Sequence, residues 1–128
     1  MEVGEVYSKR VIVTDDMAAD NAAEGVPHVY GTPSLVALIE NTAHEALRSE
    51  FAPGQTSVGT FIKLEHSSPT PIGMEVRCDV KLVSRDRIMA HFEAEAFDSA
   101  GKICTCNHSR AVVTKEKIEA KAQGKGHQ

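Results

Sequence analysis

Tryptophan is absent from this chain, aromatic residues make up only 5% of it, and its cysteines number three. A small, odd number of cysteines without secretory context is typical of reduced thiols in the cytoplasm. No apolar run approaches the roughly 20 residues that a membrane-spanning helix needs. The N-terminal MEVGEVYSKRVIV also lacks the basic and then apolar pattern of a secretory signal. We therefore expect a cytoplasmic protein that does not associate with a membrane.

The charge pattern argues against binding to nucleic acid. Charges of both signs are mixed along the chain and the net charge is −4, so the sequence has no basic patch for nucleic acid. The glycine patterns of nucleotide-binding loops and the G-x-S-x-G motif of serine hydrolases are absent as well. The length of 128 residues suits one domain with its own core. We expect that domain over residues 1–115, followed by a polar tail over 116–128.

The segment TPSLVALIENTAHEAL, residues 32–47, has the pattern of a largely buried helix. Thr32 is placed to cap its N-terminus, Pro33 suits the first helical position, and the following APGQ ends it. Glu40 stands at the border of the apolar stripe. A carboxylate there either reaches water or is held in a largely apolar pocket, where desolvation can make it a usable general base.

After the helix the apolar period changes to two, which is typical of strands. We expect strands within residues 5–14, 57–66, 74–82, 88–96 and 102–114. Short connections between the last four imply antiparallel neighbours, and a single apolar helix must be covered by the sheet. The predicted fold class is α+β: a hot-dog fold, in which a curved antiparallel sheet wraps one long central helix. The exposed edges of so short a sheet favour a homodimer.

Several strand residues have both a structural and a functional interpretation. Alternation in SVGTFIKLEH predicts one face carrying Val58, Thr60, Ile62, Leu64 and His66. His66 is either a satisfied core residue or a catalytic one. Gly59 marks a bulge, a close approach by the helix, or a close approach by a ligand. Arg110 makes a surface ion pair or clamps a phosphate or carboxylate. Cys104, Cys106 and His108 share a face with it, but their spacing matches no zinc motif, so no metal site is expected.

Three motifs in this order resemble the fluoroacetyl-CoA thioesterase-like family of hot-dog proteins. They are GTPSLVALIE at the start of the helix, VGTFIKLEHSSPTPIGMEV in the strand, loop and strand that follow, and CNHSRAVV with its H-x-R pattern in the last strand. The resemblance extends from about Val29 to Thr114. It covers most of the chain.

The resemblance implies an acyl-CoA thioesterase for a short or small acyl group, with Thr32, Glu40 and His66 as catalytic residues. Glu40 would attack the thioester carbonyl or activate a water, and His66 would orient the reactants or transfer a proton. Thr32 would hydrogen-bond Glu40 or the developing oxyanion. The family's substrate-binding positions fall on Gly59, Thr60 and Arg110. The resemblance implies no metal or redox cofactor, since coenzyme A enters with the substrate, and it implies an acyl pocket at the subunit interface.

Selectivity for a fluorinated acyl group is not implied, because DDMAADNAAEG before the helix has no aromatic residue to cover the acyl pocket. Two other functions fit the same fold: a non-catalytic protein that binds acyl-CoA or another small ligand, and a hydratase. A hydratase needs an Asp and a His close together, whereas the helix offers only Glu40 and, on its wetter side, His44. A purely structural module would leave Thr32, Glu40 and His66 unexplained together.

Overall fold

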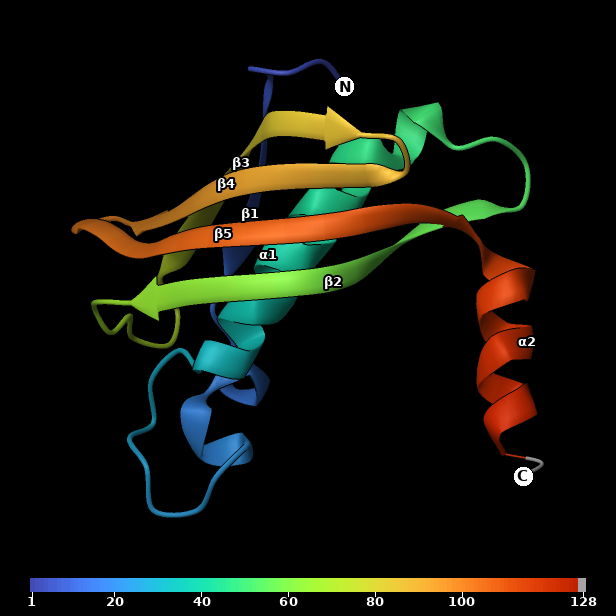
Figure 1. The fold of residues 1–128 in the computed structure, drawn as a ribbon. Helices are drawn as coiled ribbons and strands as arrows, with labels where there is room; N and C mark the ends of the chain where they lie inside the picture. The colour runs from blue at the N-terminus through green and yellow to red at the C-terminus, as the bar shows by residue number, and fades with distance from the viewer. Residues whose placement is uncertain (127–128) are drawn as a thin grey trace.

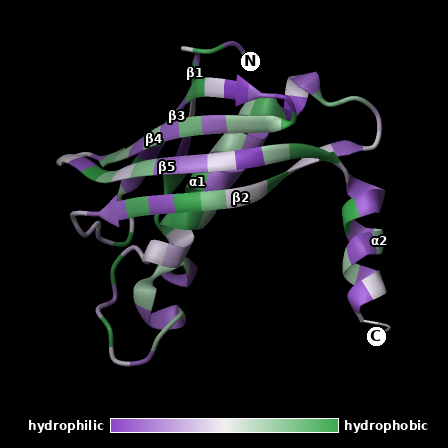
Figure 2. Ribbon diagram, in the orientation of Figure 1, coloured by the Kyte–Doolittle hydropathy of each residue, from purple (hydrophilic) through white to green (hydrophobic). Residues whose placement is uncertain are grey.

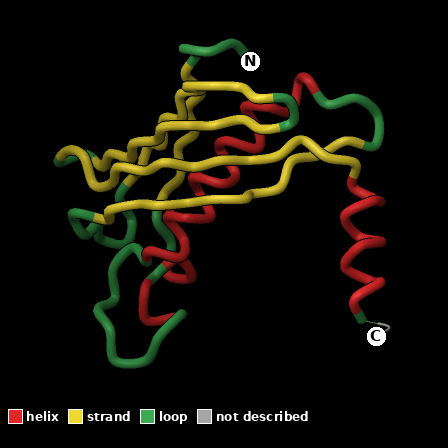
Figure 3. The backbone as a smooth tube through the Cα atoms, viewed as in Figure 1, coloured by secondary structure: helices red, strands yellow, loops and turns green. Residues whose placement is uncertain are grey.

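Five antiparallel strands curve around one long helix in the computed structural model, which describes residues 1–126 (Figures 1 and 3). The strands are β1 (Val6–Ile12), β2 (Gln55–His66), β3 (Glu75–Asp86), β4 (Met89–Asp98) and β5 (Gly101–Thr114), in the order β1-β3-β4-β5-β2. The helices are α1 (Thr32–Leu47), α2 (Lys115–Lys125) and the short 3-10 turns η1 (Asp15–Met17), η2 (Ala19–Asn21) and η3 (Arg48–Glu50). The predicted hot-dog architecture is confirmed. The expectation that each of the last four strands pairs with the next is wrong for β2 and β3, because β2 pairs with β5 at the edge of the sheet and β3 lies between β1 and β4.

The core lies between α1 and the inner face of the sheet. Leu35, Ile39 and Leu47 of α1 are fully buried, and alternate residues of β3 and β4 meet them. The strand residues buried in this core include Val76, Val80, Leu82, Ala90 and Phe92. The alternating colours along the strands in Figure 2 follow this division between the core face and the outer face. Each large side chain that is fully buried contributes about 1.5–3 kcal/mol, so this helix–sheet contact is the main source of stability.

Strand β2 forms one edge of the sheet, and its pairing with β5 is interrupted between Gly59 and Phe61. The extra residue, Thr60, reverses the alternation at that point. Ser57 and Gly59 therefore face α1 before the bulge, whereas Ile62, Leu64 and His66 do so after it. The prediction that Val58 and Thr60 share a face with His66 is wrong, because a period-two pattern cannot register one inserted residue.

The C-terminal helix α2 leaves the end of β5 and stands away from the sheet (Figure 1). All of its residues are exposed, including the hydrophobic Ile118, and hydrophilic and hydrophobic residues are interspersed along it (Figure 2). The predicted polar tail is therefore helical as far as Lys125, and its residues 127–128 lie outside the described residues. Within residues 1–126, no helix is long and apolar enough to cross a membrane.

Candidate active site

The start of α1 and the end of β2 meet in a hydrogen bond between Thr32 and His66. Thr32 Oγ1 lies 2.8 Å from His66 Nδ1. Gly31, with extended backbone angles, is the N-cap of α1, so the prediction that Thr32 caps the helix is wrong. A glycine is needed there because a Cβ would come within 2.9 Å of the Ala19 backbone. Since Thr32 is the first helical residue, its hydroxyl is directed to His66 instead of to the helix backbone.

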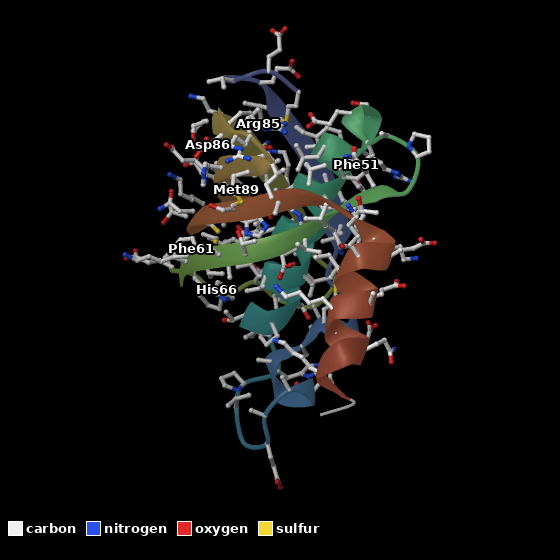
Figure 4. All side chains as sticks on the ribbon, turned by 45° about the vertical axis from the view of Figure 1, so that its right-hand side comes forward. Phe51, Phe61, His66, Arg85, Asp86 and Met89 are labelled. Atoms are coloured by element: carbon white, nitrogen blue, oxygen red, sulfur yellow. The ribbon has the colours of Figure 1, made fainter. Side chains whose placement is uncertain are left out.

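One ring nitrogen of His66, Nε2, is buried without a hydrogen-bond partner in the described part of the chain. Desolvation lowers the pKa of His66, partly offset by a backbone contact with Ser68, so the neutral imidazole is the dominant form at neutral pH. A neutral ring whose Nδ1 is fixed by Thr32 presents Nε2 in a defined direction, as a group that orients or transfers a proton must. Figure 4 labels His66 and Phe61 on the same side of the molecule, along β2.

Glu40 lies beside the bulge of β2, two helical turns beyond Thr32. Its Oε2 accepts a hydrogen bond from Arg110 Nη1 at 3.4 Å, and a Cβ on Gly59 would lie only 2.9 Å from the same oxygen. Gly59 therefore leaves room for the close approach of a helix side chain. The Glu40 side chain is 41% exposed whereas that of Arg110 is 7% exposed. Of the two interpretations given from the sequence, the carboxylate that reaches water is the one observed in this subunit. The largely apolar pocket is wrong, because Glu40 is partly open to solvent and lies beside a buried cation.

A hollow of about 200 Å³ opens next to the Glu40 carboxylate. Its lining residues are Glu40, Gly59, Thr60, Phe61, Ile62 and His108. Thr60, the inserted residue of the bulge, donates from Oγ1 to the carbonyl of Ser109 on the neighbouring strand. The hollow gives a small group direct access to the carboxylate.

Arg110 is too buried for the surface ion pair considered from the sequence. Its Nε donates to Ser57 Oγ at 2.8 Å, its Nη2 donates to the Ser57 carbonyl at 3.1 Å, and its Nη1 lies 3.2 Å from His108 Nε2. Ser57 was not identified from the sequence. Its position two residues before Gly59 on one strand face would have been the signal. His44, expected on the wetter side of the helix, bonds this same Ser57 through Nδ1 at 2.7 Å.

The candidate catalytic residues form two groups in one subunit. Thr32 and His66 contact each other, and Glu40 contacts Arg110, but in residues 1–126 Glu40 makes no hydrogen bond to Thr32 or His66. Thr32 and Glu40 are eight residues apart on one helix, a rise of about 12 Å. Within one subunit the two groups are therefore about two turns of α1 apart.

The three cysteines do not add a metal centre to this picture. All three are buried free thiols, and burial raises the pKa of Cys104 to about 11 and that of Cys106 to about 12. His108, on the same strand face, is already bonded to the Phe61 carbonyl through Nδ1. In the described part of the chain, no group of three or more histidine, cysteine, aspartate or glutamate side chains is arranged to hold a metal ion.

Known proteins resemble this chain in sequence and in fold. Residues 13–116 match the sequence model of the fluoroacetyl-CoA-specific thioesterase family. The fluoroacetyl-CoA thioesterase of Streptantibioticus cattleyicolor is 32% identical over 99 residues, which is 77% of this chain and 71% of that protein. A solved structure of the fluoroacetyl-CoA thioesterase FlK superposes with a TM-score of 0.94 at 28% identity, covering 98% of this chain and 97% of that one.

The fold extends to more distant proteins. A thioesterase superfamily member from Thermus thermophilus superposes with a TM-score of 0.91 over 98% of this chain and 93% of that one, at 20% identity, which shows the fold alone. The chain thus has the hot-dog fold of these proteins. It belongs to the fluoroacetyl-CoA-specific thioesterase family and is an acyl-CoA thioester hydrolase. Membership of this family disfavours the non-catalytic binding protein and the hydratase.

Proposed function

We propose that this enzyme hydrolyses a short or small acyl-CoA thioester with Thr32, His66 and Glu40, and that Glu40 reaches the site from the second subunit of a homodimer. The observation that carries the proposal is the separation described above: a fixed Thr32–His66 pair at one end of β2 and an accessible Glu40 carboxylate two helical turns away. Both groups lie along the same edge strand.

The free edge of β2 supports the dimer. An unpaired strand edge is a template for a second strand, and Phe61 in the middle of this edge is exposed. An antiparallel pairing of two β2 strands centred on Lys63, with Thr60 left out of the pairing as in the bulge, would set Gly59 opposite the partner subunit's His66. Because Gly59 contacts Glu40, this register brings the carboxylate of one subunit toward the imidazole of the other.

The proposed chemistry assigns each residue one task. Glu40 attacks the thioester carbonyl or activates the attacking water. The Thr32 hydroxyl, at the positive end of α1, stabilises the oxyanion, and His66 Nε2 transfers a proton or orients the reactants. Gly59 and Thr60 line the acyl site. Arg110 was predicted to bind substrate directly; its burial favours a role through Glu40 instead.

The size of the acyl group follows from the small hollow beside Glu40 and from the relatives. The relatives named above act on fluoroacetyl-CoA. In this chain the residues before α1, DDMAADNAAEG, carry no aromatic side chain to enclose a fluorinated group, so we propose a small acyl group without selectivity for fluorine. The reaction needs no metal or redox cofactor, since attack, proton transfer and oxyanion stabilisation are all supplied by side chains. Three free thiols support a reducing, cytoplasmic location.

Thiol release from acyl-CoAs ranging from acetyl to phenylacetyl and medium-chain tests the catalytic assignment. We expect turnover of the small thioesters by the wild type and none by Glu40→Gln. Glu45→Gln is the matched control, because Glu45 lies on the same helix but bonds Lys9 and Tyr7 of β1. Near wild-type turnover by Glu40→Gln would show that the proposed mechanism is wrong.

Mixing two inactive variants tests whether the site is shared. A dimer of one Glu40→Gln subunit and one His66→Gln subunit contains one intact site if Glu40 acts across the interface. Random exchange of subunits would then restore about one quarter of the wild-type rate. If both residues act within one subunit, every site in the mixture carries a substitution and the mixture stays inactive.

A further inference from the structure

The buried guanidinium of Arg110 is held mainly by groups that have no part in the proposed reaction. Its two shortest hydrogen bonds go to Ser57, at 2.8 Å from Nε and 3.1 Å from Nη2. The third goes from Nη1 to His108 Nε2 at 3.2 Å, and the contact with Glu40 is the longest at 3.4 Å. Ser57 and His108 are themselves buried. Ser57 and His108 therefore fix the position of the Arg110 guanidinium. The Glu40 carboxylate is in turn oriented by its longer hydrogen bond from Arg110.

The hydrogen bonds of this network fix the proton on His108. His108 Nδ1 must donate to the Phe61 carbonyl, at 2.7 Å, and an arginine only donates hydrogen bonds, which leaves His108 Nε2 as the acceptor for Arg110. His108 is therefore neutral. Ser57 Oγ accepts from Arg110 Nε, and a neutral His44 can accept the serine's own proton at Nδ1, 2.7 Å away. Desolvation, followed for His44 by the neighbouring Arg110 charge, lowers the pKa of each histidine, which agrees with this assignment.

We infer that His108 and Ser57 are positioning residues for thioester hydrolysis, which hold the Arg110 guanidinium so that it orients the Glu40 carboxylate without pairing tightly with it. The inference rests on the proposed catalytic role of Glu40. An arginine side chain that lost these partners would regain its rotamer freedom, and it could close on Glu40 with the short, bidentate geometry that the pair prefers. A carboxylate engaged in that way is a poorer nucleophile and a poorer base.

Two substitutions of the same histidine separate positioning from packing. In His108→Gln the amide oxygen reaches the place of Nε2 and still accepts from Arg110. In His108→Asn the shorter amide reaches only the place of Nδ1, so it keeps the donor to Phe61 and loses the acceptor for Arg110. Both remove the ring and leave a comparable void. Because His108 also lines the hollow beside Glu40, the two variants are compared with each other. We expect kcat of His108→Asn to lie about 10- to 100-fold below that of His108→Gln, with a similar KM in the two.

Ser57→Ala gives an independent measurement, since it removes the acceptor of the 2.8 Å bond from Arg110 Nε. We expect it to lower kcat by a similar factor. Thermal unfolding and size-exclusion chromatography establish that each variant is folded and has the oligomeric state of the wild type. Equal losses in His108→Asn and His108→Gln, or full activity in both His108→Asn and Ser57→Ala, would overturn the inference.

Comparison with Glu40→Gln separates this inference from the proposed function. If Glu40→Gln retains wild-type turnover, the proposed function fails. If Glu40→Gln is inactive but His108→Asn and Ser57→Ala are fully active, only the positioning role fails. Where Glu40→Gln keeps a measurable residual rate, adding His108→Asn should lower that rate no further, because both changes act through the same carboxylate. A further loss equal to that seen in the wild-type background would contradict action through Glu40.

Discussion

Gly59→Ala adds one methyl group at the point where α1 comes closest to β2. The new Cβ would lie 2.9 Å from Glu40 Oε2, 3.3 Å from Arg110 Nη1 and 3.4 Å from His108 Cε1. Ordinary contacts begin at 3.4 Å, so the carboxylate oxygen has to retreat by at least about 0.5 Å. A displacement of 1 Å at a reacting group can cost about 100-fold in rate. We therefore expect kcat to fall about 10- to 100-fold.

The same substitution should leave the fold intact or strengthen it. Gly59 lies outside the left-handed region, so alanine fits its backbone, and the closest obstacle is the end of a flexible side chain. Replacing a glycine in this way reduces the entropy of the unfolded chain, which raises the free energy of unfolding by about 0.4–1 kcal/mol. The expected result is an enzyme that is as stable as the wild type, or more so, and much less active.

The assay combines thiol release with urea unfolding, and Gly124→Ala in α2 is the control. A Cβ on Gly124 meets nothing within 4 Å, so this variant should show the stability gain without the loss of activity. Wild-type kcat in Gly59→Ala would refute the reasoning, because it would mean that the position of the Glu40 carboxylate does not limit catalysis. A large loss of stability would instead show that the Glu40 side chain cannot move away from the new methyl group.

Three further predictions follow from contacts elsewhere in the molecule. Thr32→Val removes the 2.8 Å hydrogen bond to His66, so kcat should fall about 10- to 100-fold. The melting temperature should change little, because Gly31 and not Thr32 is the N-cap of α1. An unchanged kcat would contradict a catalytic role for the hydroxyl. Phe92→Ala empties the core under α1 and should lower the free energy of unfolding by about 3–5 kcal/mol in urea titrations, and a loss below about 1 kcal/mol would mean that the core repacks. Burial raises the pKa of Cys78, Cys104 and Cys106, so an aromatic disulfide reagent at pH 8 should label almost no thiol of the native enzyme. After denaturation it should label all three thiols. Rapid labelling of the native enzyme would contradict the burial of these cysteines.

Local pattern was sufficient for the elements and for their layering. The stripe containing Leu35, Ile39 and Leu47 could only belong to a helix covered on one side, and the alternation of Val76, Val80 and Leu82 could only belong to a strand with one buried face. Backbone geometry imposes the helical period of about 3.6 residues and the strand period of two. Both can therefore be recognised in a single sequence. The three motifs in order then indicated the family, and with it Thr32, Glu40 and His66 as candidate catalytic residues.

The tertiary structure decided that the candidate catalytic residues form two groups, and which neighbouring side chains hold each group in place. The bulge at Thr60 reversed one strand face and brought Ser57 and Gly59 to the helix. No sequence period records this, since an inserted residue looks like any other. The environment of Glu40 was equally inaccessible, because Arg110 reaches it from a strand 70 residues away in the chain. The sequence by itself determined the fold and the types of side chain available for catalysis, because these depend on local periodicity and chemistry. Only the packing of distant segments decided which side chains touch: Thr32 with His66, and Glu40 with Gly59 and Arg110.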